Sequence, residues 1–137
     1  MCRRFGKSEK GQAAVEFALC LPFMLLILAA VADFGWLFMH ELSISMAVRE
    51  GTRAAIINAS SDGAYIDRAK NKVEEIATLC NNGTLDVTVT PSNPREPGEG
   101  DIEVKADYNI HMLTPVAKLF FGGMEYEIHS SYTMRAS

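Results

Sequence analysis

The pattern of apolar and polar positions divides the chain into one long apolar segment near the N-terminus and a mixed remainder. From Phe17 to Ala32 no residue is charged, and the apolar character continues to Met39 with Asp33 as its acidic interruption. The segment Phe17–Met39 has 23 residues, and about 20 helical residues cross a hydrocarbon core of about 30 Å. A helix also satisfies its own backbone hydrogen bonds in lipid. The pattern therefore predicts a membrane-spanning helix, and the alternative is a buried core helix of a soluble protein.

Four residues of this segment set its expected position in the bilayer. Glu16 and Asp33 are 17 residues apart, which is about 25 Å along a helix. We expect one near each interface, because a charge costs less there than at the bilayer centre. Trp36 is suited to anchor the far end at the headgroups. Pro22 removes one helical hydrogen bond and predicts a kink.

The charge of the first residues predicts the orientation. Residues 1–11 carry four basic side chains and one acidic side chain, so the positive-inside rule places the N-terminus in the cytoplasm and the remainder outside. The chain is therefore expected to cross a membrane once. The net charge of the chain is −4, so the part beyond the basic leader is strongly acidic. This balance excludes a nucleic-acid partner, which would need a basic patch.

The helical pattern continues beyond the apolar segment. Ala47, Gly51 and Ala55 recur at helical spacing and predict a groove of small residues that permits close backbone approach. The groove either packs on this chain's own outer domain or contacts another subunit. The polar cluster Asn58–Gly63 is expected to end the helix.

The outer part of the chain changes from a helical period to an alternating one. A second helix is predicted from about Tyr65 to Leu79, followed by strands at about residues 85–90, 102–110 and 126–134. The connections Pro91–Gly100 and His111–Gly123 are expected to be irregular. The prediction is an α+β fold: a long N-terminal transmembrane helix, a second helix and a three-stranded antiparallel sheet with one face covered by the helices.

No arrangement of residues indicates catalysis. His40, His111 and His129 are far apart, and no zinc, phosphate or nucleophile motif occurs. We therefore expect no enzymatic activity, no cofactor and no metal. Cys20 and Cys80 lie in different compartments of the predicted topology, so no disulfide between them is expected.

One processing route would release a secreted domain that binds a ligand or a surface. Ala30-Val31-Ala32 before Asp33 fits a signal-peptidase site. Against it stand the acidic Glu16 at the start of the apolar run and the apolar residues Phe34–Met39 beyond the site.

A second route fits the leader better. The motif Gly11-x-x-x-x-Glu16-Phe17, between a basic leader and an apolar helix, resembles the prepilin-peptidase site of type IV pilins. The resemblance implies cleavage after Gly11, which leaves Gln12 as the first mature residue. The Glu-Phe pair is typical of the Flp, or tight adherence (Tad), branch.

Further motifs are similar to the TadE-like pseudopilins. They are Gly11–Pro22, Asp33-Phe34-Gly35, Ala47–Ala55 and Leu113-Thr114-Pro115. The resemblance implies a leader over residues 1–11, a pilin-like helix over 12–58 and an extracytoplasmic domain over 59–137. It implies a minor pilin of the bacterial inner membrane that supports pilus assembly and adhesion. The implied partners are prepilin peptidase, the Tad inner-membrane platform proteins, TadF-like proteins, the Flp major pilin and membrane lipid.

Glu16 has two interpretations. In pilin-like assemblies the new amine of a neighbouring subunit can neutralise such a glutamate, which makes its charge less costly in lipid. The alternative is an interfacial residue that reaches out of the lipid. A further hypothesis for the whole chain is a membrane anchor whose Pro91–Gly100 loop recognises another envelope protein.

Overall fold

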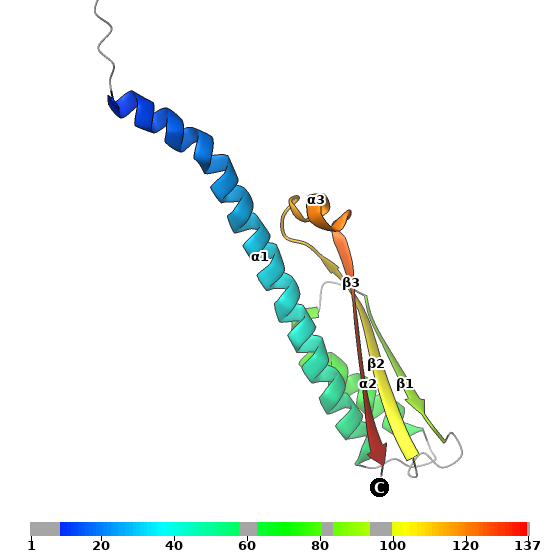
Figure 1. Cartoon of the computed structure of the whole chain (residues 1–137). Helices are drawn as coiled ribbons and strands as arrows, with labels where there is room; N and C mark the ends of the chain where they lie inside the picture. Colours follow the sequence, from blue (N-terminus) through cyan, green and yellow to red (C-terminus); the bar gives the residue numbers. More distant parts are fainter. Residues whose placement is uncertain (1–8, 58–62, 81–83, 94–99, 137) are drawn as a thin grey trace, which may run out of the picture.

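The computed structural model describes residues 9–57, 63–80, 84–93 and 100–136. It contains one long helix, two short ones, a 3-10 turn and three strands (Figure 1). In chain order these are α1 (Glu9–Ile56), α2 (Ala64–Ile76), η1 (Thr78–Cys80), β1 (Leu85–Pro91), β2 (Gly100–His111), α3 (Ala117–Phe121) and β3 (Glu125–Ala136). The predicted α+β class, with a long apolar helix, a second helix and a three-stranded antiparallel sheet, is confirmed.

Helix α1 has two halves with different surroundings. Its N-terminal half stands away from the rest of the molecule and curves along the part that contains Pro22 (Figure 1). Every residue from Gly11 to Leu28 is exposed. The C-terminal half lies along the sheet and α2, and it forms one layer of the folded domain (Figure 1).

The sheet is an antiparallel meander with β2 in the middle. Val104 of β2 pairs with Val89 of β1 and with Tyr132 of β3. Alternate residues of β2 are buried, because one face of the sheet is covered by the helices and the other meets solvent. The buried residues of β2 are Ile102, Val104, Ala106, Tyr108 and Ile110.

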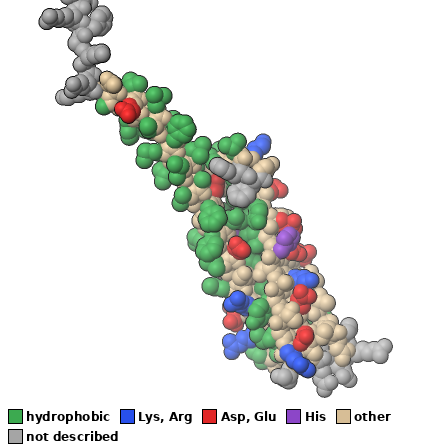
Figure 2. Space-filling model, viewed as in Figure 1, with side chains coloured by type: hydrophobic (Ala, Val, Ile, Leu, Met, Phe, Trp, Pro, Cys, Tyr) green, Lys and Arg blue, Asp and Glu red, His purple; other side chains and the backbone are tan. Residues whose placement is uncertain are grey.

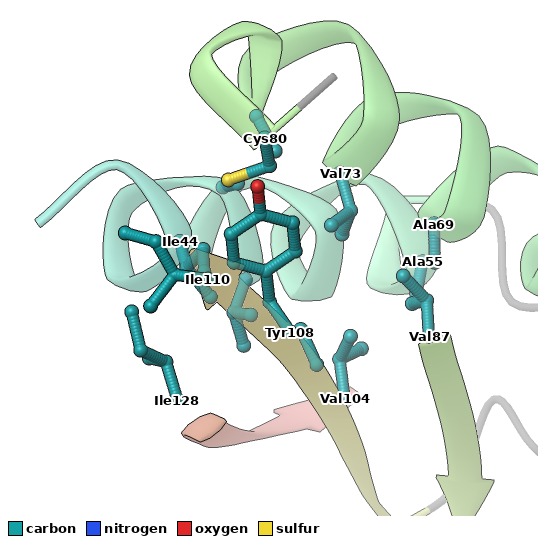
Figure 3. Packing of buried hydrophobic residues seen from close by; sticks show 14 of the residues in the cluster. Ile44, Ala55, Ala69, Val73, Cys80, Val87, Val104, Tyr108, Ile110 and Ile128 are labelled. Carbon is teal, nitrogen blue, oxygen red and sulfur yellow. The ribbon is translucent and has the colours of Figure 1, made fainter. Parts of the chain in front are cut away.

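The core forms where the buried stripe of α1 meets this face of the sheet and α2. The stripe repeats every three or four residues, as one face of a helix requires. It consists of Asp33, Leu37, His40, Ile44, Ala47, Val48, Gly51, Thr52 and Ala55. Figure 3 shows Ile44 of α1 gathered with Ile110 and Ile128 of the sheet, while Val73 projects from α2 toward the same core.

Three details differ from the sequence-based expectations. Helix α1 begins at Glu9, three residues before Gln12. Helix α2 ends at Ile76, because Ala77 leaves the helical conformation, and η1 then carries the chain to Cys80. The connection after β2 contains α3, whose five residues are too few to show a helical period. The predicted helix stop at residues 58–62 and most of the Pro91–Gly100 loop lie outside the described residues.

Candidate membrane and assembly surface

The predicted processing motif lies in the first turns of α1. Gly11, Gln12, Glu16 and Phe17 are all exposed. Glu16 is the only charged residue between Gly11 and Ala32. Among the side chains that the structure describes, none forms an ion pair with it. Its charge therefore stands alone on an apolar surface.

Helix α1 is long and apolar enough to cross a membrane. The rest of the chain buries no residue of its most apolar stretch. Figure 2 shows apolar side chains covering its N-terminal half and continuing down one edge of the molecule, while charged side chains gather over the domain. An apolar surface of this length, exposed on all sides, is typical of a segment surrounded by lipid.

Asp33 lies at the point where the domain first meets α1. Its carboxylate is only 2% exposed. One oxygen accepts a hydrogen bond of 2.9 Å from the backbone N–H of Thr114, and the other accepts from the Thr114 hydroxyl. The position expected to sit at the far interface is thus sheltered by the loop before α3. Two hydrogen bonds to a carboxylate offset much of the cost of burying it.

Trp36 packs into the protein rather than standing free on the helix. Its ring lies 4.5 Å from the ring of His40, which stacks in turn at 5.9 Å on Tyr108 of β2. The His40 Nδ1–H donates to the carbonyl of Trp36 at 2.9 Å. The Trp36 indole N–H is buried without a partner among the described residues. These rings connect α1 to β2 just C-terminal to Asp33 along the helix.

The groove of small residues packs against this chain's own α2. Ala47 and Ala55 are fully buried, and Gly51 faces Val73 and the backbone of Ala69. Of the two uses proposed for the groove, the described contacts show the internal one.

An apolar ridge remains exposed on α1 beside the domain. Its members follow one another at steps of four residues, so they lie along one side of the helix. They are Phe34, Phe38, Leu42 and Met46. Met46 is 60% exposed although it lies well beyond the membrane segment. Exposed apolar surface outside a membrane indicates a surface that contacts another protein.

The comparison with known families matches the part of the chain that carries these features. The family model described as TadE-like protein matches residues 11–53. The N-terminal helix of this chain is TadE-like. No curated protein and no solved structure matches the chain.

The TadE-like match confirms the resemblance predicted from the motifs of α1. It begins at the processing motif, includes Asp33 and Trp36, and ends within the small-residue groove, before Ala55. It associates the chain with the Tad pilus, and the apolar helix α1 fits a membrane-anchored protein. The sheet, α2 and the Leu113-Thr114-Pro115 motif lie beyond the matched residues.

Two residues of the TadE-like helix have contacts that the sequence did not reveal. The first is Asp33, which pairs with Thr114, 81 residues away in the sequence. The sequence identified Thr114 only as part of the Leu113-Thr114-Pro115 motif. His40, for which the sequence predicts no metal-ligand role, is a buried ring between Trp36 and Tyr108. A histidine one helical turn after a tryptophan was the available signal.

Behind these rings, Cys80 of η1 lies against Tyr108, whose hydroxyl points toward the sulfur (Figure 3). Burial raises the pKa of the Cys80 thiol to about 11. Burial also raises the pKa of Tyr108, and the charge of Cys80 raises it further. A thiol so strongly desolvated is unreactive, so Cys80 fills the core.

The solvent face of the sheet carries its own polar cluster. His129 of β3 lies 2.7 Å from Asp107 of β2 and 3.7 Å from Glu127. The hydrogen bond that His129 donates to the Asp107 carboxylate raises the pKa of His129. Desolvation opposes this shift, and the charges of Glu127 and Asp107 add to it. No group of three or more metal-ligating side chains gathers there or elsewhere in the described ranges.

Proposed function

We propose that this chain is a minor pilin, or pseudopilin, of the Tad pilus assembly system. In this proposal prepilin peptidase cuts it after Gly11, and it supports pilus assembly and adhesion without enzymatic activity of its own. The observation that carries the proposal is the extent of the TadE-like match, from the processing motif at Gly11 through the exposed half of α1 into the packed half.

The geometry of the first turns supports the processing step. Gly11 and Gln12 are exposed, and no part of the described domain lies against them. In the proposed topology the basic leader is cytoplasmic and the domain is extracytoplasmic. A peptidase on the cytoplasmic side therefore reaches the bond between Gly11 and Gln12 without unfolding the domain.

Glu16 provides a reason for assembly. An isolated carboxylate at the edge of the hydrocarbon is costly, and Glu16 has no ion-pair partner among the described side chains. After cleavage, Gln12 of a neighbouring pilin would present a cationic amine. Pairing of the two charges would make the assembled state more favourable than the isolated subunit.

The exposed ridge of α1 provides a second contact, which extends from the end of the membrane segment to residues beyond it. Phe38, Leu42 and Met46 present an apolar side that the chain's own domain leaves uncovered. Its proposed partners are other pilins, namely the Flp major pilin and TadF-like proteins, with the Tad platform proteins contacting the membrane part.

The mass of the mature protein tests the proposal. A product that begins at Gln12 is expected, and Gly11→Trp should keep the leader. Gly35→Ala is the matched control, because Gly35 lies in the same helix with open space around its Cα. A product that begins at Asp33 would instead support signal-peptidase cleavage after Ala32 and a secreted domain.

A deletion strain tests the role in the pilus. Loss of surface pili and of adhesion is expected, with restoration by the wild-type chain. Normal piliation of the deletion strain, together with extraction of the protein from membranes of the wild-type strain, would refute the assembly role. That result would favour an anchor that recognises an envelope protein through residues 91–100.

A further inference from the structure

The connection between β2 and β3 folds into a compact cap, residues Met112–Met124. The Met112 N–H donates to the Met124 carbonyl at 2.9 Å, which closes the base of the cap. Helix α3 ends at Phe121 and is capped by Gly122. The φ of Gly122, 74°, lies in the left-handed region and lets its N–H reach the Lys118 carbonyl at 3.2 Å. The cap lies at the end of the domain nearest the free half of α1 (Figure 1).

The surface of the cap is more apolar than is expected for part of an extracytoplasmic domain. Leu119 is 76% exposed, Leu113 is 56% exposed and Met124 is 45% exposed. Lys118 is the only charged residue in the sequence of the cap. Such a cluster of large exposed apolar side chains indicates an interaction surface. A single exposed lysine within it is suited to reach lipid phosphates.

The cap is joined to α1 by the hydrogen bonds between Thr114 and Asp33, and it faces the apolar part of α1 that precedes Asp33. An open apolar groove of about 480 Å³ lies between them, and its lining includes Leu26, Ile27 and Val31 of α1 with Val116 of the cap. The cap thus reaches α1 at a level that the sequence assigns to the membrane segment.

In the proposed topology, the length of α1 places this level within the bilayer. Residues 11–28, the stretch exposed on all sides, number 18. They extend about 27 Å at about 1.5 Å per residue. This falls short of a hydrocarbon core of about 30 Å even if the polar first turn is included. A complete crossing needs the next turns of α1, where the groove and the cap lie.

We propose that the cap inserts into the outer leaflet of the lipid bilayer that α1 crosses. The inference rests on the proposed membrane topology. Leu113 and Leu119 contact acyl chains, which also fill the groove, and Lys118 lies at the phosphates. Thr114 screens the Asp33 carboxylate from lipid at this depth. Lipid is the occupant favoured here, because the exposed apolar side chains of the cap and of the span line or flank the same open groove.

Spin labels in the full chain test the insertion. The chain is reconstituted in vesicles of phosphatidylethanolamine and phosphatidylglycerol, with Cys2→Ser and Cys20→Ser. Cys80 is kept, since it is buried. Nitroxides are attached in separate variants at Leu119→Cys and Leu113→Cys. Thr133→Cys, exposed on β3 away from the cap, is the water control, and Leu25→Cys on α1 is the membrane control. Collision rates with oxygen and with a water-soluble nickel complex report the depth of each label.

If the cap inserts, both cap labels collide more often with oxygen than with the nickel complex, as the Leu25 label does. The Thr133 label collides more often with the nickel complex. Nickel-accessible cap labels with a lipid-exposed Leu25 label would overturn the insertion and leave the membrane anchor standing. Nickel access at the Leu25 label as well would overturn both the insertion of the cap and the membrane anchor. Cap labels that are shielded from both reagents and broadened by a neighbouring nitroxide would show a second chain on the cap and overturn lipid insertion.

Discussion

A Cβ atom placed on Gly51 would lie 2.4 Å from Cγ2 of Val73 and 3.2 Å from the carbonyl oxygen of Ala69. Real Cβ atoms essentially never come as close to another heavy atom as this one would to Val73, and valine is stiff at its first torsion angle. Gly51 therefore sets the distance at which α1 and α2 pack. This contact uses the small-residue groove for the folding of one chain.

Gly51→Ala should destabilise the domain by about 1–3 kcal/mol, because the added methyl forces the two helices apart. Gly35→Ala is the control, since its Cβ would meet nothing within 4 Å and alanine favours a helix. Thermal unfolding of the full chain in detergent measures both. Val73→Ala combined with Gly51→Ala should cost less than the two single changes together. Strict additivity would show that the clash is not the cause.

The pairing of Asp33 with Thr114 predicts a cost for losing one hydroxyl. Thr114→Val keeps the shape and the backbone N–H but leaves one carboxylate oxygen without a donor. We expect a loss of about 1–3 kcal/mol in unfolding free energy. Thr114→Ser retains the hydroxyl and should stay close to wild type. Equal stability of the valine and serine variants would mean that the hydroxyl hydrogen bond contributes nothing.

The contrast between α1 and the cap shows what the pattern of the sequence could predict. The strands and the long helix were predicted because their apolar residues repeat with periods of two and of three to four over many residues. Helix α3 has five residues, so no period can appear. The partner of Asp33 lies 81 residues away, and local spacing carries no information about such a contact.

The candidate site divides in the same way. Gly11 and Glu16 were identified from a local motif, because their proposed roles depend on neighbouring residues. Asp33 and Trp36 were assigned to an interface by their distance along the helix alone. Their actual surroundings depend on how the cap and β2 pack against α1. These contacts join residues far apart in the sequence, so local patterns do not predict them.

The exposed ridge predicts a variant that folds but does not assemble. Met46→Asp introduces a charge on the ridge while the core stays intact, so the unfolding free energy should change by no more than about 0.5 kcal/mol. Co-purification with pilin partners should fall markedly, because a desolvated carboxylate opposes an apolar contact. Thr88→Asp places the same charge at an exposed site of β1 and should co-purify normally. Equal recovery of partners by both variants would remove the ridge from the assembly surface.

Glu16 allows a separate test within the membrane. Glu16→Ala should still lose its leader, because the glycine remains, but should fail to co-purify with other pilins. Glu16→Asp keeps the charge and should retain part of the assembly. The mature mass and the amount of co-purified pilin are measured for each variant. An alanine variant that assembles normally would favour a glutamate that merely reaches out of the lipid.

The cluster on the solvent face of the sheet predicts a dependence of stability on pH. The pKa of His129 is raised in the folded chain, chiefly by its hydrogen bond with Asp107, while in the unfolded chain it is about 6.5. The stabilisation is therefore fully present below about pH 6.5 and is lost as the pH rises through the folded-state value. Asp107→Asn removes the main cause of the shift, so its Tm should follow pH less steeply over this window than the wild-type Tm. His111→Gln, which removes the exposed histidine paired with Glu125 at 3.7 Å, is the control and should leave most of the slope in place. If His111→Gln reduces the dependence of Tm on pH and Asp107→Asn does not, the effect belongs to the pair of His111 with Glu125 and not to His129.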